Sequence, residues 1–151
     1  MIKIVKRIID VLFVVIIVVL GIYFVLRVTN KVVIYEVKTG SMEDGIHVGD
    51  YIITYKCNKY NVGDVVTYEV NGFFVTHRIV EKNGNKVITK GDANNIVDEE
   101  IDIKNIKGRM IYNGGLLNII INYKFVIIGF MLMIYLVTYY LDSCETTKIK
   151  K

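Results

Sequence analysis

Two long apolar runs frame the chain, one near each end. The first, IIDVLFVVIIVVLGIYFVL at 8–26, has 19 residues and one charged side chain, Asp10. At about 1.5 Å per residue, a helix of this length reaches about 28 Å, close to the thickness of a bilayer core. The run is longer than the apolar part of a cleaved secretory signal, and no small-x-small cleavage site follows it. We therefore expect an uncleaved transmembrane anchor.

The second run, FVIIGFMLMIYLVTYYL at 125–141, carries no charge. It lies at the short end of the spanning range of about 17–25 residues. Its tyrosines suit a membrane interface, although they would also suit a protein core. We expect a second transmembrane helix within 119–141, with a buried or surface-lying helix as the alternative.

Between these runs, several segments alternate apolar with polar residues, which is typical of half-buried strands. Six segments are rich in Val, Ile, Thr, Tyr and Phe: 32–37, 51–56, 64–70, 73–81, 86–90 and 101–112. Asn71-Gly72 and Asn83-Gly84 lie between successive segments, and Asn-Gly accepts the positive φ values of tight hairpin turns. The sequence therefore predicts a mainly β fold, with a small coiled or closed antiparallel β domain at 28–118 flanked by two transmembrane α-helices.

Charge divides along the same boundaries. Residues 1–27 hold four bases and one acid, 119–151 hold four bases and two acids, and 28–118 hold 11 bases and 12 acids. The positive-inside tendency predicts cytoplasmic ends at 1–7 and 142–151 and places the β domain on the exterior face of the cell membrane. Because the excess positive charge sits at the chain ends, no nucleic-acid surface is indicated. The lipid bilayer is the expected partner, and the oligomeric state is left open.

Polar side chains gather in two loop-like stretches of the β region. TGSMEDGIHVGD at 39–50 contains Ser41 among small and polar residues, and TKGDANNIVDEE at 89–100 has the Gly, Asp and Asn residues of a turn. An ordinary acidic turn or a weak divalent-ion loop is an alternative for 89–100, but its spacing does not fit an EF-hand. No cofactor or metal ion is expected.

The chain has two histidines, which are the side chains best suited to act as a base near neutral pH. His77 lies in a predicted strand, on the same face as Val75 and Ile79. From that placement alone, a satisfied core histidine is the commoner case. His47 is interpreted as a surface or packing residue.

In chain order, TGSME after an anchor, VTHRIV and TKGDANNIVDE resemble the signal peptidase I family, in its endoplasmic-reticulum-type (Ser-His-Asp) branch. The resemblance covers roughly residues 35–112. It implies a membrane-bound serine endopeptidase, a hydrolase that removes N-terminal signal peptides from exported preproteins, with a β-rich catalytic domain. One departure is visible, because the family usually has proline after SME and this chain has Asp44.

The resemblance assigns the nucleophile to Ser41 and the general base to His77. Asp98 and Asp92 are both candidates for the acid of the triad. Asp98 is favoured, with Asp92 as a structural support. The Ser41 backbone N–H and the Thr39 hydroxyl are the candidate oxyanion donors.

A serine hydroxyl needs a base within hydrogen-bond reach, and a carboxylate on the far ring nitrogen fixes the histidine tautomer. We further expect the strand before Ser41 to pair with an extended substrate. A Ser-Lys dyad with Lys90 or Lys82 as base is a narrower alternative. A non-catalytic two-span protein whose β domain binds a partner or ligand is another, and it predicts that Ser41, His77 and Asp98 lie out of mutual hydrogen-bond reach.

Overall fold

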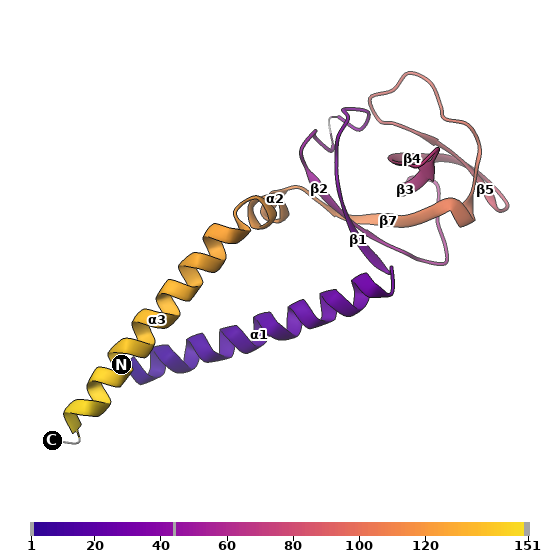
Figure 1. Cartoon of the computed structure of the whole chain (residues 1–151). Helices are drawn as coiled ribbons and strands as arrows, with labels where there is room; N and C mark the ends of the chain where they lie inside the picture. The colour runs from indigo at the N-terminus through magenta and orange to yellow at the C-terminus, as the bar shows by residue number, and fades with distance from the viewer. Residues whose placement is uncertain (1, 44, 150–151) are drawn as a thin grey trace. The chain divides into compact units, whose positions relative to one another are not determined.

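The computed structural model describes residues 2–43 and 45–149, with side chains described for 4–43 and 45–141. Asp44, the departure from the family pattern, lies outside the described residues. The chain divides into two compact units, Val25–Asn118 and a helical unit of Met1–Phe24 with Ile119–Lys151. The first unit contains the labelled strands β1 to β5 and β7 (Figure 1), and the site described below lies within it.

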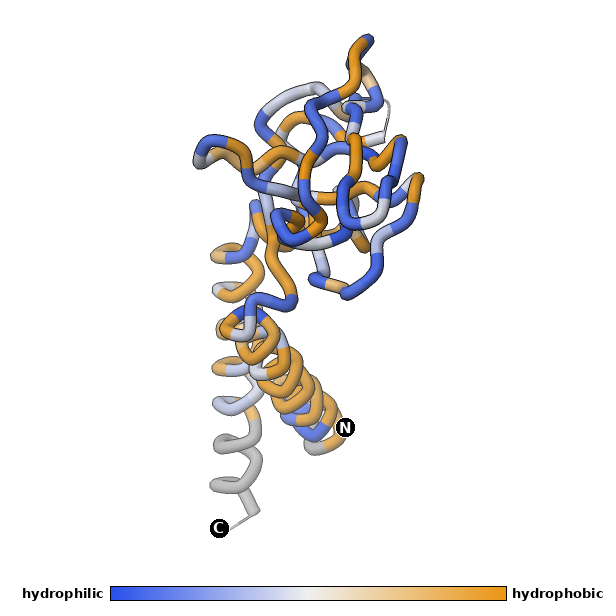
Figure 2. Tube along the Cα trace, turned by 90° about the vertical axis from the view of Figure 1, so that its right-hand side faces the viewer, coloured by the Kyte–Doolittle hydropathy of each residue, from blue (hydrophilic) through white to orange (hydrophobic). Residues whose placement is uncertain are grey.

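Two long helices, α1 (Ile2–Val28) and α3 (Lys124–Ile149), include the apolar runs at 8–26 and 125–141. Figure 2 shows predominantly apolar residues along α1 and the coloured part of α3, whereas apolar and polar residues are mixed through the β domain. The stretches Ile4–Val28 and Lys124–Leu141 are long and apolar enough to cross a membrane, and neither is buried. The alternative of a buried core helix for 125–141 is therefore not supported. The ring of Tyr135 lies beside that of Phe13, with centroids 6.3 Å apart.

A hydrogen-bonded cap ends α1 and starts the β domain. Asn30 adopts a left-handed conformation with φ 53°, its N–H donates to the Arg27 carbonyl, and the Lys31 N–H donates to the Leu26 carbonyl. This is the Schellman arrangement, which satisfies carbonyls at the end of a helix. The chain then enters its first strand within two residues.

Seven strands form one antiparallel sheet in the order β1-β2-β7-β3-β4-β5-β6. Their bounds are β1 (Val32–Glu36), β2 (Tyr51–Tyr55), β3 (Val65–Val70), β4 (Phe73–Asn83), β5 (Lys86–Lys90), β6 (Ile101–Asp102) and β7 (Ile106–Asn113). The mainly β class with flanking helices is confirmed. Among the described strands, β1 and β6 are edges that do not pair with each other, so the sheet is open. Bulges in the β2/β7, β3/β7 and β4/β5 ladders bend the strands, and the sheet is strongly curved in Figure 1.

Two details of the predicted strands are corrected. The segment 101–112 is not one strand, because a 3-10 turn at Ile103–Asn105 separates β6 from β7, capped by the Asp102 side chain, which accepts from the Lys104 N–H. Both hairpins are present, and Asn71 and Gly72 both have positive φ. In the second hairpin, however, Asn83 is the last residue of β4 and pairs with Lys86. The turn therefore begins at Gly84, one residue later than predicted.

The β domain has two apolar clusters. The larger contains Tyr60, Val66, Tyr68, Ile79, Val87 and Ile106. The smaller contains Met42, Ile46, Ile52 and Val65, with Tyr35, Val37 and Met110 packed against it. Met42 and Ile46 of the smaller cluster belong to the 39–50 loop, so their burial fixes the position of this otherwise polar loop.

A short helix, α2 (Gly115–Asn122), follows β7. The Asn118 side chain accepts from the Tyr51 N–H at 2.8 Å and donates to Asp50 at 2.6 Å. Asn113 donates to the Gly45 carbonyl at 2.8 Å. The end of the β domain is thus hydrogen-bonded to the second half of the 39–50 loop.

Candidate active site

Ser41 lies at the start of a tight turn that follows β1. The Glu43 N–H donates to the Gly40 carbonyl, and the Ile46 N–H donates to the Met42 carbonyl. Met42 and Ile46 are each 2 % exposed and act as apolar anchors for the turn. Ser41 is therefore followed directly by residues that are anchored in the core, which holds its hydroxyl in place.

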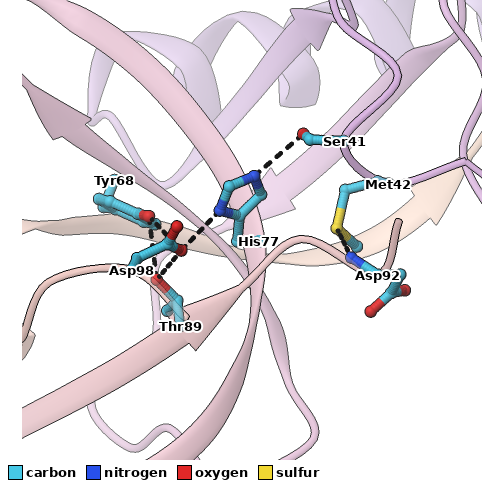
Figure 3. A network of polar contacts seen from close by, with 7 residues as sticks. All are labelled: Ser41, Met42, Tyr68, His77, Thr89, Asp92 and Asp98. Carbon is cyan, nitrogen blue, oxygen red and sulfur yellow. Dashed lines mark hydrogen bonds and ion pairs between the residues drawn. The ribbon is translucent and has the colours of Figure 1, made fainter. Parts of the chain in front are cut away.

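His77 comes from the middle of β4 and is 6 % exposed. Strand alternation places it on the same face as Val75 and Ile79, as the sequence predicts. Its Nε2 lies 2.9 Å from Ser41 Oγ (Figure 3). The buried imidazole therefore directs one ring nitrogen at the serine hydroxyl, with the Tyr68 ring packed edge-on beside it at 6.5 Å between centroids.

Asp98 approaches His77 from the opposite side of the ring. Its Oδ2 lies 2.6 Å from His77 Nδ1. The Asp98 N–H also donates to the Thr89 carbonyl at 2.8 Å, so the 91–97 loop returns to the end of β5. Ser41, His77 and Asp98 therefore form a continuous hydrogen-bonded series, contrary to the expectation of the non-catalytic alternative.

The carboxylate of Asp98 has two further hydrogen-bond partners, which the sequence did not identify. The Tyr68 hydroxyl donates to Oδ2 at 3.0 Å, and the Thr89 hydroxyl donates to the same oxygen at 2.7 Å (Figure 3). Burial, together with the negative charge of Asp98, raises the pKa of Tyr68 to about 12. Tyr68 is thus protonated, and able to donate, across the neutral range. The available sequence signal was a polar side chain at an inward-facing position of a predicted strand, which holds for both residues.

Asp92 points away from His77 and pairs with Arg78. The guanidinium donates through Nε to Oδ1 at 2.9 Å and through an Nη atom to Oδ2 at 2.6 Å, and its other Nη donates to the Gly63 carbonyl. The hydrogen bonds from Arg78 lower the pKa of Asp92. The Asp92 N–H donates to the Met42 sulfur at 3.4 Å (Figure 3). Asp92 therefore connects the 91–97 loop to β4 and to the turn that contains Ser41 and Met42.

The 91–97 loop packs tightly on the backbone of Ser41. The Ala93 N–H donates to the Ser41 carbonyl at 3.0 Å. A Cβ atom on Gly91 would stand 2.5 Å from that same carbonyl oxygen, closer than real Cβ contacts. Only glycine at position 91 allows this approach.

The hydrogen bonds and strand pairings described for Lys82, Lys90 and His47 involve residues other than Ser41. Lys82 donates to the Tyr60 carbonyl at 2.8 Å, and Lys90 is paired with Arg78 in the β4–β5 ladder. His47 is exposed, and its backbone N–H donates to Asp50. The described part of the chain has no group of three or more His, Cys, Asp or Glu residues that could hold a metal ion.

A groove with a volume of about 660 Å³ opens beside the Ser41 hydroxyl. One wall is the segment 35–39, which includes Thr39, and the other is 72–77 at the start of β4. Met42, Ile46 and Ile52 from the smaller apolar cluster also line it. The rings of Tyr35 and Phe74, one from each wall, meet with centroids 5.0 Å apart. The groove can therefore hold an extended, largely apolar segment of chain against the serine.

Comparison with known proteins gives consistent results. The model of the Peptidase S24-like family matches residues 17–111. The chain is 41 % identical over 69 residues to the signal peptidase complex catalytic subunit SEC11 of Plasmodium falciparum, a match that covers 41 % of this chain and 38 % of the relative. It is 39 % identical over 80 residues to SEC11 of Colletotrichum graminicola, covering 47 % and 46 %. The matches thus span less than half the length of these relatives, and they confirm the resemblance to the endoplasmic-reticulum-type branch of signal peptidase I.

Proposed function

The chain belongs to the Peptidase S24-like family, and on that premise we propose that it is a serine endopeptidase that removes signal peptides from exported preproteins. The observation that carries the proposal is the hydrogen-bonded series from Ser41 through His77 to Asp98, with distances of 2.9 and 2.6 Å. Nucleophile, base and orienting acid each stand within reach of the next, as acyl transfer by a serine requires.

In this proposal, His77 Nε2 removes the proton from Ser41 Oγ as the hydroxyl attacks the scissile carbonyl. The imidazolium then gives that proton to the leaving amine, and a water molecule activated by the same nitrogen hydrolyses the acyl-enzyme. Asp98 holds the Nδ1–H and stabilises the imidazolium. The Ser41 N–H and the Thr39 hydroxyl donate to the developing oxyanion, each contributing on the order of 10²–10³ in rate.

The groove supports an extended polypeptide as substrate. Because β1 is an edge strand whose only described partner is β2, the outer side of 35–39 is free to pair with another strand. The groove lies between that edge and 72–77, and its lining is largely apolar. A substrate strand bound there would pass the Ser41 hydroxyl with alternate side chains directed into the groove.

The two apolar helices support a location at a lipid bilayer. We propose that both helices span the cell membrane with the chain ends in the cytoplasm and the β domain on the exterior face. A signal peptide is itself an apolar segment followed by a cleavage site, so a membrane-anchored protease meets it at the bilayer surface.

Purified full-length protein in lipid vesicles and a radiolabelled preprotein test the proposal. We expect Ser41→Ala and His77→Ala to abolish release of the mature product, while His47→Ala retains the activity of the parent because the His47 side chain is exposed and the imidazole in contact with Ser41 is that of His77. Equal cleavage by Ser41→Ala and the parent would contradict the proposal. Sequencing the N-terminus of the product checks that one bond is cut.

A further inference from the structure

Asp98 Oδ2 accepts from three donors that come from three neighbouring strands. Besides His77 Nδ1 from β4, these are the Tyr68 hydroxyl from β3 and the Thr89 hydroxyl from β5. We propose that Tyr68 and Thr89 are positioning residues that hold the Asp98 carboxylate so that His77 is kept as its Nδ1–H tautomer. This inference rests on the proposed function of Ser41 and His77.

Strand register explains why these side chains meet. Val66 pairs with His77 across the β3–β4 ladder, so Tyr68, two residues on, lies on the same face as His77. Ile79 pairs with Thr89 across the β4–β5 ladder, which places Thr89 on that face too. The sheet therefore presents one polar group from each of three adjacent strands toward the returning 91–97 loop.

The two hydroxyls are deeply buried. Tyr68 is 2 % exposed and belongs to the larger cluster, and Thr89 is 0 % exposed and pairs with Ile79 of that cluster. A buried hydroxyl without a partner is costly, so each strongly favours the arrangement in which it donates. The Thr89 hydroxyl also lies 2.9 Å from the Tyr68 oxygen, so its single proton is directed between that oxygen and Asp98 Oδ2, which lies closer at 2.7 Å. Together they fix the position of Oδ2 independently of His77.

The consequence for His77 is a choice of tautomer. A carboxylate held at 2.6 Å from Nδ1 can only accept, so the ring proton is retained on Nδ1. Nε2 then has a free lone pair toward Ser41 Oγ, which is the productive arrangement. If Asp98 moved, the proton could shift to Nε2 and leave no acceptor for the serine proton. Tyr68 is protonated, and so able to donate, at neutral pH, and burial raises its pKa further, to about 12.

The first measurement is the tautomer itself. The chain has two histidines, so ¹⁵N-histidine-labelled full-length protein in detergent micelles gives two pairs of ring signals, one Nδ1 and one Nε2 for each ring, which His47→Gln assigns. We expect His77 in the parent to be the Nδ1–H tautomer. In Tyr68→Phe, Thr89→Val and their double variant, we expect a growing fraction of the Nε2–H form, with Thr89→Ser restoring the parent spectrum.

The second measurement is the rate at which a fluorophosphonate labels Ser41. We expect a loss of about tenfold for each single variant and about 10²-fold for the double variant, since a hydrogen bond to a charged group is involved. Tyr60→Phe and Thr54→Val are matched controls, because both residues are buried on strands or loops of the same domain. Their hydroxyls bond to the Cys57 N–H and the Val33 carbonyl instead.

The outcomes separate the two proposals. If His77 stays in the Nδ1–H form and labelling stays within twofold of the parent in the double variant, the positioning role is refuted while the protease remains. Equal losses in Tyr60→Phe and Thr54→Val would also refute it, because the effect would then be general destabilisation. If Ser41 in the parent does not react and no preprotein is cut, the proposed function itself fails. In that case the tautomer spectrum still reports on the hydrogen bonds of Tyr68 and Thr89.

Discussion

Replacement of Gly91 by alanine tests whether the 91–97 loop sets the position of the nucleophile. The added Cβ would lie 2.5 Å from the Ser41 carbonyl oxygen and 2.7 Å from the amide nitrogen of the Asn94 side chain. The Asn94 side chain can rotate, but the Ser41 carbonyl is main chain and accepts a hydrogen bond from Ala93. The contact between the added Cβ and the Ser41 carbonyl oxygen can therefore be relieved only if the 91–97 loop moves away from the turn that contains Ser41.

The size of the effect follows from the displacement required. The two atoms must move apart by at least about 0.5 Å to reach the 3.0 Å that is the lower limit of such contacts. Overpacking of this kind costs about 1–3 kcal/mol in stability. A displacement of about 1 Å in a reacting group can reduce the rate about 10²-fold, so half of that predicts a loss of about tenfold in kcat.

The assay is preprotein cleavage by full-length protein in vesicles, with urea unfolding measured alongside. Gly45→Ala is the matched control, since it lies in the same 39–50 loop and its Cβ would come no closer than 4.0 Å to the Met42 carbonyl oxygen. We expect Gly45→Ala to keep the kcat of the parent. A Gly91→Ala protein that folds and cleaves within twofold of the parent would show that the loop does not position Ser41.

Three other contacts described above can be tested in the same protein. Asp98→Asn should reduce kcat about 10⁴-fold, as loss of the orienting acid does in serine triads. Asp92→Asn only loosens a partly exposed ion pair with Arg78, so its kcat should fall less than about tenfold, and preprotein cleavage rates of the two variants test both expectations. Burial raises the folded-state pKa of Tyr68 to about 12 from its ordinary 10.0, so its stabilising contribution is complete below pH 10 and is lost as the pH rises toward 12. The free energy of unfolding of the parent, measured with urea, should therefore fall over this range by about 2 kcal/mol more than that of Tyr68→Phe. Asn118→Ala should destabilise the β domain by about 1–2 kcal/mol, because it leaves the Tyr51 N–H and Asp50 without their partner, and the loss should be visible in urea unfolding followed by circular dichroism.

The fold was largely predictable because its strands follow simple alternation. Five of the six predicted segments coincide with β1 to β5 within two residues at either end. The sixth, 101–112, failed because Asp102 caps a 3-10 turn through its side chain, a local hydrogen bond that apolar periodicity does not detect. The turn after β4 was displaced because Gly84 alone supplies the positive φ, so Asn83 remained available to the strand.

The curvature of the sheet was beyond the sequence for a related reason. Bulges at Ile53/Thr54, Thr67/Tyr68 and Ile79/Glu81 each insert a residue into one strand of a ladder. They depend on which strands become neighbours, and β7 joins β2 to β3 across a long separation in sequence. Alternation within one strand carries no information about that pairing.

Tyr68 and Thr89 were missed because each resembles an ordinary strand residue. Threonine and tyrosine are common in strands. The hydrogen bonds of these two hydroxyls depend on the Asp98 carboxylate, which reaches them from a loop that is distant in sequence from Tyr68. The prediction that His77 shares a strand face with Val75 and Ile79 is confirmed. What makes it different from a core histidine is that both ring nitrogens have polar partners, Ser41 and Asp98.

The path of the 91–97 loop determines which of the two acids, Asp92 or Asp98, contacts His77. Asp92 and Asp98 stand in the same polar stretch, and nothing in composition tells which of them turns toward His77. Two main-chain hydrogen bonds decide the geometry: Ala93 N–H to Ser41, and Asp98 N–H to Thr89. The first bond holds the start of the loop against the turn that contains Ser41, and there Asp92 forms its ion pair with Arg78. The second returns the loop to the strand beside β4, which brings the carboxylate at 98 to the far side of the imidazole.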